Sequence, residues 1–310
     1  MTGLARAALP ESDEVARRRY LESTGSRRFV RFWRDFIRRR PLGTAGAVLI
    51  ILMLFTAAFA DRIAPYDPVE IRFADLLQPP SFEHLLGTDP FGRDVFSRIV
   101  FGSRTALAVG FSASFVGCTL GLVLGVVGAY FGGRVDQLIQ RFMDVLLSFP
   151  LIVIAIAVVA ALGTGEDKIA NVIAAITVPI IPRVARVVRS SALSVVNMPY
   201  IEATRAVGSG AVRIMFRHVA PNVFAPCLIM LTAFLGQAIL LEASLSFLGL
   251  GVFEPTPSWG LMLRGAGMQF LEQAPWIAIA PGVAISLAVF GFNLFGDSLR
   301  DALDPRLRTA

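Results

Sequence analysis

The chain has 310 residues, of which 55% are hydrophobic and only 17% are charged. Soluble domains usually carry about 25% charged residues, so this composition excludes an ordinary soluble protein and predicts an all-α, polytopic membrane protein. The formal net charge of +6 comes almost entirely from arginine, because Lys168 is the single lysine.

Residues 1–42 are predicted to form a cytosolic tail rich in arginine. Within this tail, residues 27–40 place aromatic side chains such as Phe29 and Trp33 at helical spacing, with arginines on the opposite face. Such a pattern is typical of an amphipathic helix that lies in the anionic interface of a membrane. The aromatic stripe and the direct continuation into an apolar segment favour lipid over nucleic acid as the partner of this basic run.

Stretches of about 20 apolar residues predict six membrane-spanning helices. These predicted spans lie at 43–60, 105–130, 142–162, 169–189, 223–247 and 276–296. The transmembrane domain is therefore expected at 43–296, followed by a short tail at 297–310. In the second span, Gly117, Gly121 and Gly125 recur every four residues and predict a smooth helix face for close packing.

Arginine is concentrated in the N-terminal tail, in the loop between the fourth and fifth spans and in the C-terminal tail, whereas Lys168 falls on the opposite side. Because positively charged loops stay in the cytoplasm, this bias predicts that both termini are cytoplasmic. The loop at 190–222 is then also cytoplasmic, and the segments at 61–104 and 248–275 are extracytoplasmic.

The cytoplasmic loop carries the signals of a short helix that begins near Pro199, whose missing N–H suits the first turn. Glu202 falls in that turn, where the positive end of the helix favours it, and Gly208 can form a left-handed cap. A second short helix is expected after Gly210, and Pro221 starts the next membrane helix. A structured element of this kind indicates a docking surface for a partner protein that moves the bundle of membrane helices.

The chain carries no pattern of a catalytic, nucleotide-binding or metal site. Lys168 does not follow a glycine in a Gly-Lys-Ser or Gly-Lys-Thr motif, so a phosphate-binding loop is excluded. His84 and His218 fall on opposite predicted sides of the membrane and cannot share a metal. We therefore predict that the chain is not an enzyme and that its energy source lies on another polypeptide.

Ionisable residues are scarce within the predicted spans, whereas ion-coupled carriers keep several of them at mid-membrane. Glu242, in the outer part of the fifth span, is the one candidate for a pathway residue. The alternative for Glu242 is a satisfied carboxylate near the outer interface. An ATPase-independent channel or secondary carrier is accordingly only a remote alternative for the function.

Several motifs together resemble one transporter family. Glu202-Ala203-Thr204, with Gly208 and Pro221 at the following spacing, resembles the EAA loop of ABC importer permeases, with threonine in place of the second alanine. The segments that resemble the peptide-transporter branch of that family are Gly87–Arg98, Arg217–Asn222, Ala243–Gly251, Pro257–Gly260 and Asn293–Pro305. Over roughly residues 40–306, the chain thus resembles C-type permease subunits of dipeptide/oligopeptide ABC importers.

This resemblance implies a type I permease fold with six spans in the bacterial inner membrane. It also implies a second, homologous but different permease subunit, two cytosolic ATPase subunits that bind ATP and Mg, and an extracytoplasmic peptide-binding protein. The implied cargo is a di- or oligopeptide, with glutathione or a nickel complex as alternatives.

By the same resemblance, Glu202, Ala203, Thr204 and Gly208 would belong to a coupling helix that contacts one ATPase, within a coupling loop at 198–220. Thr204 should be tolerated there if its side chain faces the permease. The outward segments near 84–98 and 252–264, including Trp259, are expected to contact the binding protein.

Overall fold

The computed structural model describes Ile37 and residues 40–163, 168–265 and 269–303. Apart from Ile37 and Arg40, the amphipathic helix predicted at 27–40 lies outside the described residues. The described chain is built from helices, and the β pairing found in it is a single isolated bridge between Thr88 and Asp94.

The helices differ widely in length, and five of them are long and apolar enough to cross a membrane. In chain order they are α2 (Pro41–Ala58), α3 (Ala60–Ile63), α4 (Val95–Phe131), α5 (Gly133–Leu147), α6 (Leu151–Leu162), α7 (Lys168–Val196), α8 (Pro199–Ala206), α9 (Ala211–Ile214), α10 (Phe224–Phe247), α11 (Trp259–Leu263) and α13 (Trp276–Leu303). A π-helical turn at Met215–Val219 and a 3-10 turn at Ala220–Val223 join α9 to α10. The five candidate spans are α2, α4, α7, the continuous stretch Ala211–Phe247 that comprises α9, the two turns and α10, and α13.

The third predicted span, at 142–162, is wrong as a single helix. The chain bends by 96° between α5 and α6, at Pro150, which precedes α6. Proline lacks the N–H that would continue the helix, and it restricts the residue before it. The 12 residues of α6 rise only about 18 Å, less than the roughly 30 Å of a hydrocarbon core. The total is six spans if this bent pair counts as one.

Helix α4 is longer than predicted, because it begins at Val95 rather than at residue 105. The Asp94 side chain accepts a hydrogen bond from the Ser97 N–H and caps the helix. With 37 residues, α4 is about 55 Å long. The predicted outer segment at 61–104 therefore ends at Asp94. Helix α7 likewise continues to Val196, so the loop predicted from residue 190 starts at residue 197.

The glycine face predicted for the second span packs directly against α7. An added Cβ would lie 2.8 Å from Ile180 at Gly117, 2.6 Å from Val184 at Gly121 and 2.7 Å from the Ala185 carbonyl oxygen at Gly125. Small residues allow membrane helices to approach this closely, and their association then depends on van der Waals packing.

Replacing Gly121 by leucine is expected to push α4 and α7 apart, since no space exists beside Val184. Overpacking of this kind costs about 1–3 kcal/mol of stability. Thermal unfolding of the purified protein in detergent would measure the effect. The matched control is Gly282→Leu in α13, where an added Cβ meets no atom within 4 Å. Equal unfolding midpoints for the two variants would contradict the prediction.

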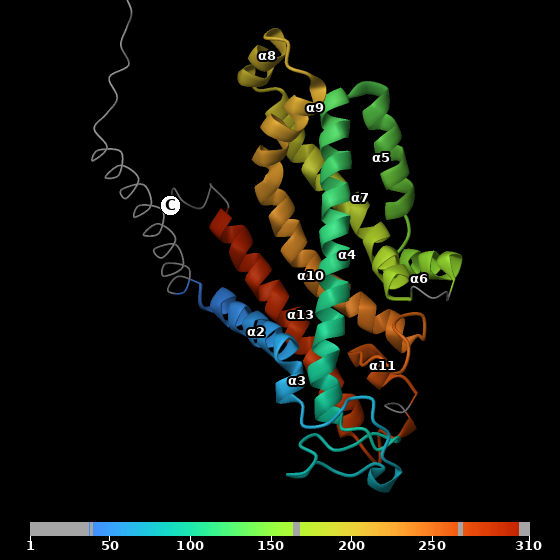
Figure 1. Ribbon diagram of the computed structural model, residues 1–310. Helices are drawn as coiled ribbons and strands as arrows, with labels where there is room; N and C mark the ends of the chain where they lie inside the picture. The colour runs from blue at the N-terminus through green and yellow to red at the C-terminus, as the bar shows by residue number, and fades with distance from the viewer. Residues whose placement is uncertain (1–36, 38–39, 164–167, 266–268, 304–310) are drawn as a thin grey trace, which may run out of the picture.

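Figure 1 shows two groups of short helices and connecting segments, which lie at opposite ends of α4. We call residues 197–214, which include α8 and α9, the knob. We call residues 60–94 and 248–275, except 266–268, the cap; its helices are α3 and α11, with a 3-10 turn at Phe73–Asp75. The knob and the cap thus lie at opposite ends of α4, and the side of the membrane that each faces stays a prediction.

The start of the first span and the end of the last lie together. The Arg40 Nη1 donates to the Ser298 carbonyl oxygen at 2.9 Å and lies 3.2 Å from an Asp301 carboxylate oxygen. These contacts hold the end of α13 against the start of α2.

Candidate functional site

The knob contains the short helix that the sequence predicts. Helix α8 has Pro199 in its first turn together with Glu202. It ends at Ala206, and Gly208, two residues later, has a φ of +80° in the left-handed region. The Gly208 N–H donates to the Arg205 carbonyl at 2.9 Å, and the Ser209 N–H donates to the Thr204 carbonyl at 3.2 Å. These bonds satisfy carbonyl groups at the helix end.

Two isoleucines anchor the knob, and the predicted coupling residues face outward. Ile201 and Ile214 are fully buried in the hydrophobic core, whereas Glu202, Ala203 and Gly208 are exposed. Val207 and Val212 are 82% and 67% exposed and add an apolar surface beside them. The knob thus combines a fixed base with an outer face that is free to bind a partner.

Thr204 lies half-buried in the knob, and its hydroxyl donates to the Tyr200 carbonyl at 2.7 Å. Its polar group is therefore satisfied within α8 itself. This local bond favours the prediction that threonine is tolerated in place of alanine at this position.

The structure adds two knob contacts that sequence reasoning missed. The Arg205 guanidinium lies 4.9 Å from the centre of the Tyr130 ring, at the end of α4, a geometry suited to cation–π attraction. The Asn222 amide donates to the Tyr200 hydroxyl at 3.3 Å. Neither pair is adjacent in sequence, so no local pattern reveals them. They connect the knob to α4 and to the turn before α10.

At the other end of α4, an ionic network joins the two segments predicted to face outward. The Arg93 side chain donates to an Asp89 oxygen at 2.6 Å and to Glu254 Oε2 at 2.8 Å. The Arg98 Nη2 donates to Glu254 Oε1 at 3.3 Å, and the Arg98 side chain is only 1% exposed. Tertiary packing therefore brings segments 84–98 and 252–264 together, although 156 residues separate Arg98 from Glu254 in the chain.

A second buried pair holds the start of α4. The His84 Nδ1 lies 2.9 Å from Asp94 Oδ1, while Asp94 Oδ2 accepts hydrogen bonds at 2.7 Å from both the N–H and the hydroxyl of Ser97. His84, Asp94 and Ser97 therefore fix the last part of the cap segment 60–94 to the first turn of α4.

Trp259 does not have the exposed position that contact with a binding protein requires. Its side chain is buried, and its indole N–H donates to the Ile99 carbonyl at 2.9 Å. The ring packs so tightly on Gly102 that an added Cβ there would lie 2.6 Å from it. The prediction for Trp259 is therefore corrected: this side chain fastens α11 to α4.

Glu242 is also buried, with 1% of its surface exposed. Its Oε1 accepts hydrogen bonds from the Ser246 and Ser258 hydroxyls, both at 2.8 Å. The Ser246 oxygen in turn accepts the Val252 N–H at 3.1 Å. Glu242 thus joins the end of α10 to the start of α11, which favours the satisfied carboxylate over a residue of a substrate pathway.

A pair of substitutions separates these two roles of Glu242. Glu242→Gln keeps an acceptor oxygen for both serines, so stability and transport are expected to change little. Glu242→Leu leaves two buried hydroxyls without their acceptor and should cost about 1–3 kcal/mol. Thermal unfolding measures the effect on stability, and substrate uptake measures the effect on transport. If Glu242→Gln is stable but has lost uptake, Glu242 is a residue of the substrate pathway after all.

Comparison with known proteins identifies the family. Residues 117–309 match the family described as "Binding-protein-dependent transport system inner membrane component". Residues 28–80 match the "N-terminal TM domain of oligopeptide transport permease C". The two matches together cover most of the chain, including the knob and most of the predicted spans.

Named relatives are similar over nearly their whole length. The chain is 41% identical to a dipeptide transport system permease protein, DppC, of Alkalihalophilus pseudofirmus, covering 89% of this chain and 91% of the relative. It is 44% identical to a glutathione transport system permease protein, GsiD, of Escherichia coli, covering 89% of this chain and 90% of the relative.

Among solved structures, the inward-facing MetNI methionine ABC transporter superposes with a TM-score of 0.52 at 21% identity, covering 66% of this chain and 96% of the matched chain. This likeness supports the permease fold alone. The family matches and the curated relatives go further: the chain belongs to the inner-membrane permease components of binding-protein-dependent ABC importers, in the branch of the dipeptide and oligopeptide permeases.

Proposed function

We propose that this chain is one half of the translocation pathway of an ATP-driven importer of short peptides. Its partners would be a second, different permease subunit, two ATPase subunits that carry ATP and Mg, and an extracytoplasmic peptide-binding protein. The observation that carries this proposal is the knob, whose base is buried through Ile201 and Ile214 and whose Glu202, Ala203 and Gly208 are exposed.

In this proposal the knob lies in the cytoplasm and the cap on the outer side. Support comes from the distribution of lysine and arginine in the sequence and from the positions of knob and cap at opposite ends of α4 (Figure 1). A movement imposed on the knob would reach the bundle through its packed base and through the contact of Arg205 with Tyr130. Coupling of this kind requires elements with discrete packed arrangements, which a rigid knob supplies.

The names of the relatives favour a peptide as cargo. Both dipeptide and glutathione permeases are among them, and glutathione is itself a small peptide. We therefore propose di- or oligopeptides as the substrate class, with glutathione as the alternative within that class. A nickel complex is the more distant alternative from the same family resemblance.

Reconstitution of the complete importer in proteoliposomes tests the proposal. The expected result is uptake of a radiolabelled dipeptide that requires ATP inside and the binding protein outside, with glutathione and a nickel complex assayed in parallel. The chain reconstituted alone should neither hydrolyse ATP nor pass the peptide. Flux through the lone chain would instead indicate a channel or secondary carrier.

A further inference from the structure

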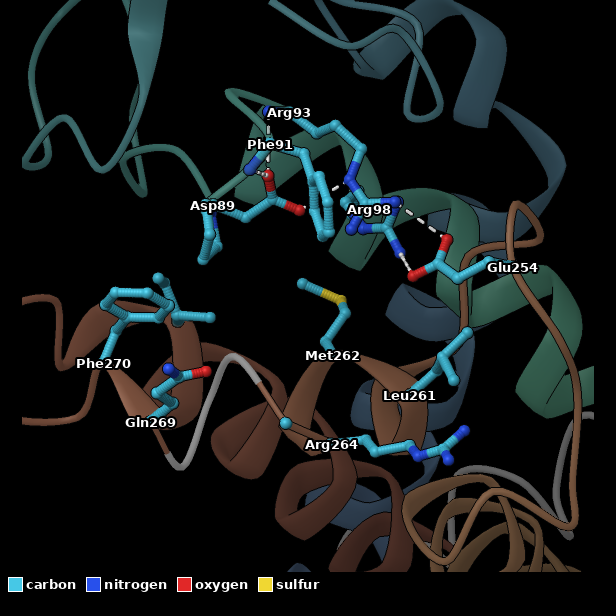
Figure 2. A pocket seen from close by; sticks show the side chains of 13 residues that line it. Asp89, Phe91, Arg93, Arg98, Glu254, Leu261, Met262, Arg264, Gln269 and Phe270 are labelled. Atoms are coloured by element: carbon cyan, nitrogen blue, oxygen red, sulfur yellow. Dashed lines mark hydrogen bonds and ion pairs between the residues drawn. The ribbon is translucent and has the colours of Figure 1, made fainter. Parts of the chain in front are cut away.

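The cap contains a cavity of about 340 Å³ between the start of α4 and the segment around α11. Figure 2 shows Asp89, Arg93, Arg98 and Glu254 on one side and apolar side chains such as Met262 on the other. Pockets for small ligands have volumes of about 300–1,000 Å³ and combine apolar walls with a few polar groups. The cavity therefore has the size and the mixed lining of a small-molecule site.

Positive charge is in excess around this cavity. It is lined by three arginines and two carboxylates, namely Arg93, Arg98, Arg264, Asp89 and Glu254. The guanidinium of Arg264 also packs close to Gly249, where an added Cβ would lie 2.5 Å from it. Because a cleft with one excess sign of charge attracts the opposite sign, this lining favours an anionic ligand.

One buried donor at the cavity lacks an acceptor. The Arg98 Nη1 donates to the Pro68 carbonyl at 3.0 Å, and its Nη2 donates to Glu254. Its Nε–H is buried and has no hydrogen-bond partner among the described residues. Buried donors are nearly always paired, and an unpaired one is costly. The hydrogen-bonding capacity of the Arg98 guanidinium is therefore only partly used by the protein.

We propose that the cavity binds a small carboxylate that carries an apolar group. The carboxylate would lie against Arg93 and Arg98, and the apolar group against Leu261, Met262 and Phe270. The C-terminal residue of a short peptide has this chemistry, and its identification as a peptide rests on the proposed function. The site would then receive the substrate on the outer side of the bundle.

Glu254 is an internal competitor for the same two arginines. One of its oxygens contacts Arg93 and the other contacts Arg98, and its side chain is 47% exposed. A ligand carboxylate would have to share or displace these contacts. Removing the charge of Glu254 should therefore strengthen binding of the acid, whereas removing the charge of Arg93 should weaken it.

The test is equilibrium binding of radiolabelled alanyl-phenylalanine and of its C-terminal amide to the full chain in lipid nanodiscs. We expect the acid to bind at least 10-fold more tightly than the amide. Arg93→Gln should remove this preference, and Glu254→Gln should increase it several-fold. The control is Arg62→Gln, an exposed arginine of α3 that does not line the cavity, and its preference should equal that of the unmodified chain.

Equal binding of acid and amide, absence of binding, or an unchanged preference in both Arg93→Gln and Glu254→Gln would overturn the site. If Arg93→Gln fails to fold, Glu254→Gln still tests the site, because the preference for the acid is expected to increase in this variant, and a misfolded protein would not show an increase. Uptake by the complete importer is measured separately. Peptide uptake without acid preference would overturn the cavity site alone, and acid preference without peptide uptake would overturn only the proposed import function.

Discussion

Gly208→Trp is expected to abolish peptide uptake by the assembled importer while the chain itself stays folded. An added Cβ at Gly208 meets no atom within 4 Å, so a side chain can leave the backbone there without a clash at its first atom. Its φ of +80° adds a backbone cost of about 1–2 kcal/mol for a residue other than glycine. That cost affects only an exposed turn and should leave the rest of the chain folded. The indole would, however, prevent the proposed ATPase subunit from binding the knob.

The experiment compares ATP-dependent uptake with thermal unfolding for Gly208→Trp and Gly163→Trp. Gly163 also has a positive φ, of 74°, and free space for a Cβ, but it lies at the end of α6 rather than in the knob. We expect uptake to fall at least 100-fold in the first variant and to remain in the second, with similar unfolding midpoints. Normal uptake by Gly208→Trp would show that the knob is not the coupling element.

Glu202→Lys is expected to reduce uptake by at least 10-fold. Glu202 is exposed in the first turn of α8, where a carboxylate is favoured by the helix dipole by about 0.3–1 kcal/mol. The charge reversal therefore destabilises α8 only slightly. It would, however, place an ammonium group where the proposed contact with an ATPase accepts a carboxylate. Bringing like charges together at an interface costs several kcal/mol.

Measurement of both uptake and ATP hydrolysis by the complete importer distinguishes a coupling defect from a folding defect. We expect hydrolysis to continue without stimulation by peptide-loaded binding protein. Glu70→Lys supplies the matched control, since Glu70 is an exposed glutamate of the cap that lies outside the segments expected to contact the binding protein. An equal loss of uptake in both variants would argue against a specific role for Glu202.

The elements that could be predicted are those whose signal is local. Apolar runs identify α2, α4, α7, α10 and α13, because a membrane demands about 20 apolar residues for each spanning helix. Pro199 and Gly208 delimit α8 through their own backbone preferences. The break between α5 and α6 also had a local signal, Pro150, which hydropathy averaging over 142–162 conceals.

The roles of Trp259 and Glu242 could not be predicted, because each depends on a partner from another segment. Trp259 is buried since Gly102 of α4 leaves room for its ring, and Glu242 is satisfied by Ser258 at the start of α11. A sequence pattern identifies an aromatic or acidic residue but does not show what surrounds it after packing.

The sequence by itself therefore determined the class of protein, most of its spans, and the helix and glycine cap of the knob. These follow from hydrophobicity and backbone geometry, which act over one helix or one turn. Only the tertiary structure decided which residues are anchors and which are free surfaces, and it brought Arg93 and Arg98 into contact with Glu254 on one wall of the cap cavity. Such pairings depend on contacts between segments far apart in the chain, whose geometry is set by the packing of the whole bundle.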